Sequence, residues 1–279
     1  MPIDTGSPRA DAEADFLRVR RQEVMSRLGH RLRGRDGATL SLEEVVGALG
    51  QLGERTIGVH VIDLDKVVGS VDKVRDFDPA FRPTSGRSRT RWERIAEAVR
   101  RGQALPPIDV YQVGDQYFVR DGHHRVSVLR ALGEKVVDAD VTVIRTAIDT
   151  VPIADRGDLK AAQLRRLFLE RVPLDRLAQR ECVCQNPWHY PQLAEMVEAW
   201  AARLMFREHE LLSVGHAAAR WYAEEFAPVT QMLRDAGLIV PAEGDGDAYL
   251  RAAIDRYSLV RAHVWTREVF DELRKASKK

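Results

Sequence analysis

The residues best suited to chemistry are Asp121-Gly122-His123-His124-Arg125, named here the DGHHR motif. The motif separates a strand-like segment from a helix-like one, so its last three residues fall in the first turn of that helix. Such a turn has unpaired N–H groups and the positive end of the helix dipole, which together attract anions. Cationic groups in this turn interact unfavourably with the dipole, and each one that is charged and exposed destabilises the helix by about 0.3–1 kcal/mol. Two histidines and an arginine in this turn therefore predict an anionic ligand, and phosphate is the commonest candidate.

Each residue of the motif has an expected role. Gly122 permits a positive φ or a close backbone approach to the ligand, and Asp121 caps the helix or holds a Mg²⁺ ion. His123, His124 and Arg125 contact the phosphate, and Asp121 and His124 are the candidates for catalysis. A second interpretation stays open: His124 is buried, Arg125 pairs with Asp121, and nothing binds.

The segments around the motif predict a compact α+β unit. Turn signals, alternation and helical spacing of apolar residues mark the elements. We expect strands at 56–62, 108–113, 116–120 and 137–143, a loop at 76–90, and helices at 92–102 and 123–132.

The flanking segments are predicted to be helical. Before the α+β unit, an Arg-rich helix is expected from Asp15 to Leu32, with Leu17, Val24, Met25 and Leu28 near one face. A second helix follows a capping box at 41–44. After it, amphipathic runs predict helices at 158–171, 190–208, 214–236, 246–264 and 266–276, the third kinked by Pro228. The expected domains are a helical extension (1–54), the α+β domain (55–150) and an all-α domain (151–279).

Composition excludes several classes of protein. The chain has 279 residues, 44% of them hydrophobic, and a formal net charge of +1, so it is neither disordered nor uniformly basic. It has no run of about 18 uncharged apolar residues and no apolar core near its start, which predicts neither a membrane span nor a secretory signal. Two cysteines can form at most one disulfide bond, which is too few to stabilise a fold of this size. A reducing cytoplasm is therefore the expected location.

The near-neutral total conceals local segregation of charge. Residues 16–35 hold seven arginines against one glutamate, and residues 82–101 hold seven against two. Residues 63–78 between them contain five aspartates. This pattern suits a focused phosphate site with carboxylates nearby.

The segment 105–133, LPPIDVYQVGDQYFVRDGHHRVSVLRALG, resembles the signature region of the ParB/sulfiredoxin superfamily, and the resemblance extends over residues 55–145. Sulfiredoxins carry a catalytic cysteine where this chain has His123, so their reaction is not expected. Partitioning ParB proteins bind the triphosphate of CTP with a Gly-Glu-Arg-Arg type box. This chain keeps Gly122 and Arg125 but has histidines between them. The motif looks closer to ParB-like proteins that phosphorylate free serine and to relatives of unknown role.

The resemblance implies further nucleotide contacts before the hairpin. Ser70, Arg87 and Arg89 are the residues in that place, and Arg91 is a further candidate to close over phosphates; a solvated basic loop is the alternative. A phosphotransfer reaction also needs a carboxylate that accepts a proton or binds metal. The candidates are Asp63, Asp65, Asp72, Asp76 and Asp78.

Three weaker patterns lie in the C-terminal half. Cys182-x-Cys184 followed by His189 has poor spacing for zinc, and two ordinary thiols are expected. Residues 158–180 occupy the place of a helix-turn-helix but lack its glycine-containing turn. Six aromatics are expected to build a helical core: Trp188, Tyr190, Trp200, Trp221, Tyr222 and Trp265.

Together these patterns favour a ParB-like nucleotide-binding protein, with Mg²⁺, whose ligand is a nucleoside triphosphate such as CTP. Hydrolysis would then act as a switch in a regulatory or DNA-associated protein. The alternatives are a kinase for a small metabolite and a non-catalytic interaction scaffold. DNA binding, and assembly as a homodimer, are left open.

Overall fold

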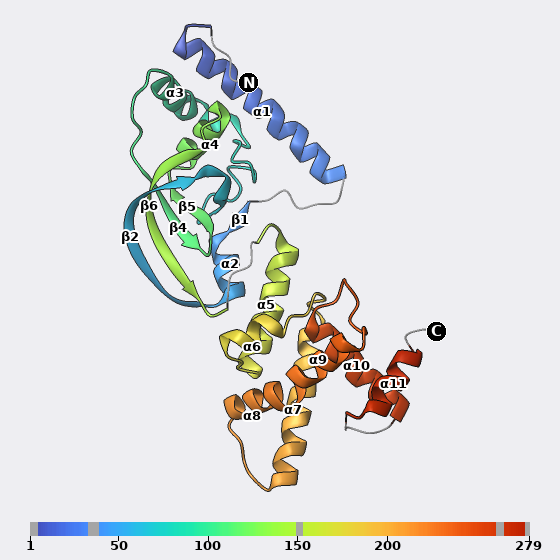
Figure 1. The fold of residues 1–279 in the computed structure, drawn as a ribbon. Helices are drawn as coiled ribbons and strands as arrows, with labels where there is room; N and C mark the ends of the chain where they lie inside the picture. The colour runs from blue at the N-terminus through green and yellow to red at the C-terminus, as the bar shows by residue number, and fades with distance from the viewer. Residues whose placement is uncertain (1–4, 33–38, 149–152, 261–264, 277–279) are drawn as a thin grey trace. The chain divides into compact units, whose positions relative to one another are not determined.

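The computed structural model describes residues 5–32, 39–148, 153–260 and 265–276. The chain divides into two units, Met1–Leu159 and Lys160–Lys279 (Figure 1). The division falls within helix α5 (Arg156–Arg171), whereas the sequence places a boundary near residue 150.

The first unit is built on a mixed six-stranded sheet with the order β1-β3-β5-β4-β6-β2. The strands are β1 (Leu40–Ser41), β2 (Gln51–Asp63), β3 (Val67–Ser70), β4 (Ile108–Val113), β5 (Gln116–Asp121) and β6 (Val136–Thr146). β4 and β5 form the predicted antiparallel hairpin, while β3 lies parallel to β5 and β4 parallel to β6. The α+β class is therefore confirmed.

The helices of this unit are α1 (Pro8–Leu32), α2 (Leu42–Leu49), α3 (Arg89–Arg100) and α4 (His123–Leu132). α4 packs on both of its sides: Val126 joins Val110 and Val119 in a core against the sheet. Val128, on its other side, joins Phe16 of α1 and Trp92 of α3. This double packing fixes the first turn of α4, which carries the DGHHR motif.

Helix α1 belongs to the core of the first unit, unlike the separate extension expected over 1–54. Its buried apolar residues are Ala12, Phe16 and Val19. Three buried carboxylates accompany them, Asp11, Asp15 and Glu23, of which Asp15 pairs with Arg100 of α3. The predicted apolar face was the wrong one: Leu17, Val24, Met25 and Leu28 are all exposed. α2 begins where the capping box predicts, but Ser41 makes no side-chain cap hydrogen bond.

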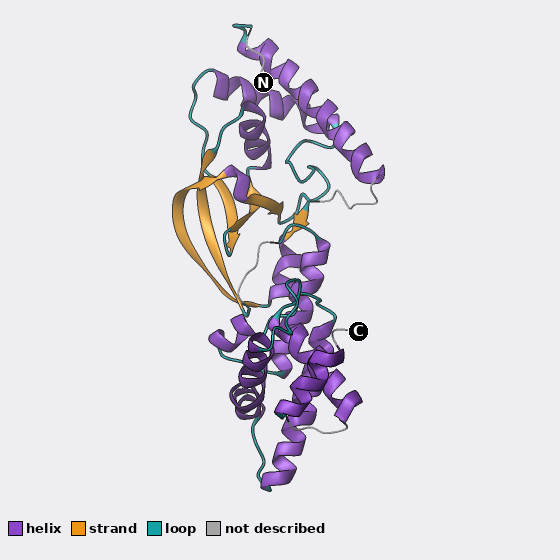
Figure 2. Cartoon of the chain, turned by 45° about the vertical axis from the view of Figure 1, so that its right-hand side comes forward, coloured by secondary structure: helices purple, strands orange, loops and turns teal. Residues whose placement is uncertain are grey.

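The described part of the second unit is entirely helical (Figure 2). After α5 come α6 (Arg176–Glu181), α7 (His189–Glu208), α8 (Val214–Trp221), a π-helical turn (Tyr222–Phe226), α9 (Ala227–Asp235), α10 (Asp245–Val260) and α11 (Arg267–Ala276). Pro228 lies in the first turn of α9, directly after the π-helical turn. The segment predicted as a single helix kinked by Pro228 is thus two α-helices joined by a π-helical turn.

Aromatic side chains form much of the core of this unit, as predicted. Trp221, Phe226 and Tyr249 are fully buried, and Trp221 donates a hydrogen bond to the Tyr249 hydroxyl. Trp188 is an exception to the predicted core, because 62% of it is exposed.

The other C-terminal patterns have structural explanations. Cys182 and Cys184 are free and buried, His189 donates to Asp247, and no metal-binding group occurs among the residues described. α6 has only six residues, which is short for a recognition helix. No helix within the described ranges combines the length and apolar character needed to cross a membrane.

Candidate functional site at the start of helix α4

The first turn of α4 has no side-chain cap. Gly122 occupies the N-cap position in a left-handed conformation, with φ of 102°. A Cβ atom there would lie 2.6 Å from Ile108 Cγ2, so both the backbone and the packing require glycine. Because the first N–H groups of a helix have no intrahelical acceptor, an uncapped turn offers them to a ligand.

His123 is buried in this turn with one ring nitrogen unpartnered. Only 1% of the side chain is exposed, and its Nε2 shares a 2.7 Å hydrogen bond with Ser70 Oγ at the end of β3. Its Nδ1 is buried and has no hydrogen-bond partner. Ser70 Oγ is held in place because it also accepts from the backbone N–H of Lys73. Ser70, which was predicted to lie near the motif, therefore contacts it directly through His123.

His124 provides a second unpartnered nitrogen. Its Nε2 is buried without a hydrogen bond, and its ring stands edge-on to Phe77, against which the ring of His123 stacks. Burial lowers the pKa of both imidazoles from 6.5 to about 4. Both histidines are therefore neutral at pH 7, and each can donate one N–H or present one lone pair.

Two cations face these histidines. Lys73 lowers the pKa of both rings, and Arg91 lowers that of His124. Within the described ranges, neither cationic side chain forms an ion pair or a hydrogen bond. Positive charge at this turn therefore comes from Lys73 and Arg91, and the sequence did not single out Lys73.

Carboxylates also lie near the two histidines of the motif. Asp72 Oδ1 is 3.8 Å from His123 Nε2, and Asp76 and Asp121 each raise the pKa of His124. Of the five aspartates proposed from sequence, Asp72 and Asp76 are therefore the ones beside the histidines, while Asp65 acts on Arg130 instead. Asp78 is bound to Arg82, whereas Asp63 pairs with Lys66.

Arg125 has a structural role at the start of α4. Its guanidinium donates to the backbone oxygens of Pro106 and Pro107 and pairs with Asp121. These bonds tie the segment before β4 to the start of α4. The interpretation in which nothing binds also expects Arg125 to pair with Asp121, and this pair is present. His123 and His124 nevertheless each keep an unpartnered nitrogen next to the pair.

The two remaining predicted residues lie apart from these contacts. Arg89 pairs with Glu93 and lies over the ring of Phe16. Arg87 lies in a short 3₁₀ turn, Gly86–Ser88, with its side chain exposed. Of the three arginines that the sequence proposes to close over phosphates, Arg91 is therefore the one whose charge acts on the motif.

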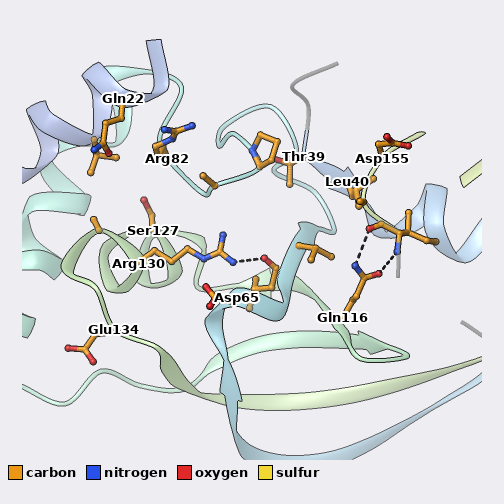
Figure 3. Close-up of a pocket in the computed structure, with 18 of the residues that line it drawn as sticks. Gln22, Thr39, Leu40, Asp65, Arg82, Gln116, Ser127, Arg130, Glu134 and Asp155 are labelled. Atoms are coloured by element: carbon orange, nitrogen blue, oxygen red, sulfur yellow. Dashed lines mark hydrogen bonds between the residues drawn. The ribbon is translucent and has the colours of Figure 1, made fainter. Parts of the chain in front are cut away.

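A cleft of about 1200 Å³ adjoins the other end of α4 (Figure 3). It is lined by Ser127 and Arg130 of α4 and by parts of α1, β1 and β3, but by no residue of the DGHHR motif. Gln116 closes one side through two hydrogen bonds with the backbone of Ile153. Arg130 donates to the backbone oxygens of Leu64 and Val67, so its guanidinium has a structural role there.

No preformed metal centre accompanies the motif in the part of the chain that the structure describes. The donor set fits Mg²⁺ only in the manner usual for that ion, with one or two carboxylates, waters and the ligand's own phosphates. Asp72 and Asp76 are the carboxylates available for this purpose, whereas Asp121 already pairs with Arg125.

Comparison with known proteins adds little about function. No protein-family model matches the chain, and no curated protein matches it. A solved structure, the C222₁ form of a Pnob8-like ParB-N domain, is similar over 81% of each chain, at 12% identity and a TM-score of 0.23. The function of the chain is therefore inferred from the geometry at the start of α4.

Proposed function

We propose that the first unit binds the phosphate groups of a nucleoside triphosphate at the first turn of α4, as a ParB-like nucleotide-binding domain. The observation that carries this proposal is the pair of buried, unpartnered nitrogens, His123 Nδ1 and His124 Nε2, at an uncapped helix N-terminus. A buried polar atom without a partner costs about 1–3 kcal/mol, which a ligand at this turn would offset.

Charge around the turn agrees with a phosphate ligand. Lys73 and Arg91 have no anionic partner among the described residues; the charge of Lys73 acts on both neutral histidines, and that of Arg91 acts on His124. The histidines contribute hydrogen bonds, and the two cations contribute charge. Arg125 positions the turn through Pro106 and Pro107.

The resemblance of residues 55–145 to the ParB/sulfiredoxin superfamily makes a nucleoside triphosphate the expected source of the phosphates, with CTP first among the candidates. Mg²⁺ would be held by the bound phosphates together with Asp72 or Asp76. When bound, it would neutralise phosphate charge during transfer.

Phosphotransfer to a small metabolite is the second candidate. It is favoured by Asp72 and Asp76 beside the histidines, because transfer to a hydroxyl group needs a carboxylate that accepts its proton. Hydrolysis as a switch needs only that a water molecule occupy the same position. Incubation with nucleotide, Mg²⁺ and free serine separates the two, since only a kinase yields a phosphorylated acceptor.

Calorimetric titration of the full chain with each of the four common nucleoside triphosphates and Mg²⁺ tests the binding proposal. We expect saturable binding of at least one. Arg91→Gln should weaken it roughly tenfold, the typical effect of losing one charge-assisted contact. Arg89→Gln is the matched control on the same helix, because Arg89 is paired with Glu93, and it should leave the affinity unchanged.

The proposal fails if no nucleotide binds, or if the Arg89 and Arg91 substitutions weaken binding equally. The second result would indicate attraction by the general charge of α3 rather than a site at the start of α4.

A further inference from the structure

The second unit contains a buried arginine that its own fold does not satisfy. Arg256 of α10 is 4% exposed, and neither its Nε nor its Nη1 has a hydrogen-bond partner. Its guanidinium stacks on Trp265 at 4.2 Å. Its anionic neighbour is Glu225, whose Oε1 lies 3.5 Å from Nη1 in an ion pair without a hydrogen bond.

Glu225 is occupied by other donors. The same Oε1 accepts from Trp265 Nε1 at 2.7 Å and from the Tyr249 hydroxyl at 3.3 Å. This carboxylate is therefore oriented by the aromatic core and offers Arg256 only a long contact. A guanidinium remains charged in proteins, so Arg256 retains a buried positive charge with two nitrogens, Nε and Nη1, that donate no hydrogen bond.

Arg256 lines a pocket of about 390 Å³ between α7 and α10. A second cation, Arg203 of α7, lines the same pocket. The pKa of Arg256 is lowered chiefly by burial, and the charge of Arg203 acts in the same direction. Arg203 forms no ion pair with any residue in the described ranges. Two arginines that repel each other across one pocket are both stabilised by an anion between them.

The remaining walls define the rest of the ligand. Met196 and Ala199 of α7 face the pocket together with Ala253 and Ile254 of α10. The volume is within the range of small-molecule sites, which combine apolar walls with a few polar groups that fix orientation. A fully hydrated anion such as phosphate suits such walls poorly.

We propose that the second unit binds a small organic carboxylate, with the carboxylate between Arg256 and Arg203 and an apolar body against Met196 and Ile254. This site lies within Lys160–Lys279, whereas the proposed nucleotide site lies within Met1–Leu159.

Calorimetric titration of the full chain with hexanoate, its neutral isostere hexanamide, and inorganic phosphate tests the proposal. We expect hexanoate to bind saturably and at least about tenfold more tightly than the other two, because only hexanoate provides both the charge and the apolar body. Nucleotide should neither compete with hexanoate nor change its affinity.

Substitutions locate the site. Arg203→Gln should weaken hexanoate binding roughly tenfold without endangering the fold, because Arg203 is exposed. Arg207→Gln, one turn further along α7 and equally exposed, removes the same charge and should have no effect. Ala199→Trp, at an exposed position of the pocket wall, should block binding while both arginines remain.

Equal binding of hexanoate and hexanamide would overturn the proposal, as would an absence of hexanoate binding. Equal effects of the Arg203 and Arg207 substitutions would also overturn it, because the charge of α7 in general would then explain the attraction.

Discussion

Acidification should destabilise the first unit through His123. The pKa of this imidazole is lowered from 6.5 to about 4, chiefly by burial and then by Lys73. The folded state therefore binds a proton less readily than the unfolded state does. As the pH falls below 6.5, the unfolded state takes up the proton first, and stability decreases until the pH reaches about 4.

The size of the effect follows from the two pKa values. The full difference corresponds to about 3 kcal/mol, and the part lost between pH 7 and pH 5 is about 2 kcal/mol. His124 acts in the same direction, but its contribution is smaller because its side chain is less buried.

Urea unfolding at pH 7, 6 and 5 measures this loss for the wild type and for His123→Asn. Fluorine NMR of protein labelled with 5-fluorotryptophan separates the units, because Trp92 is in the first unit and the other four tryptophans are at positions 188–265. The wild type should lose about 2 kcal/mol more than the variant between pH 7 and pH 5. Equal losses would refute a buried, neutral His123.

Three further predictions concern the scaffold. Gly122→Ala should destabilise the first unit by about 2 kcal/mol or more, because alanine is strained at φ of 102° and its Cβ has no room. Asp15→Asn should cost about 3 kcal/mol, measured by urea unfolding, because it removes the charge of a fully buried carboxylate that pairs with both Arg18 and Arg100. Burial raises the pKa of both Cys182 and Cys184, so a colorimetric thiol assay should detect neither in the folded protein and both in urea.

Local sequence patterns predicted the elements next to the motif because local interactions determine them. Three local signals mark these elements: the Gly114-Asp115 turn of the hairpin, the alternation of apolar and polar residues in β6, and Gly133 at the end of α4. Each signal depends only on a few neighbouring residues. β2 was predicted too short, at 56–62 instead of 51–63. The pairing of β2 with β6 shifts register between Thr56 and Gly58, and the strand continues through this irregularity.

Long-range contacts could not be predicted in the same way. Helix α1 joins the core through Phe16 and the buried Asp15, and an acidic residue on a buried face contradicts simple apolar periodicity. The choice between Arg89 and Arg91, by contrast, was available from sequence. Arg89 has Glu93 at i+4 and forms an ion pair with it, while Arg91 has Ile95 at that spacing.

The central claim is that nucleotide phosphates meet His123 and His124 at the first turn of α4. Imidazole NMR during a nucleotide titration tests it most directly, with resonances assigned from His123→Asn and His124→Asn. The ring signals of both histidines should shift saturably with ligand, and their pKa should rise from about 4, because a bound anion favours the protonated form. Saturable nucleotide binding that leaves both rings and both pKa values unchanged would contradict the account.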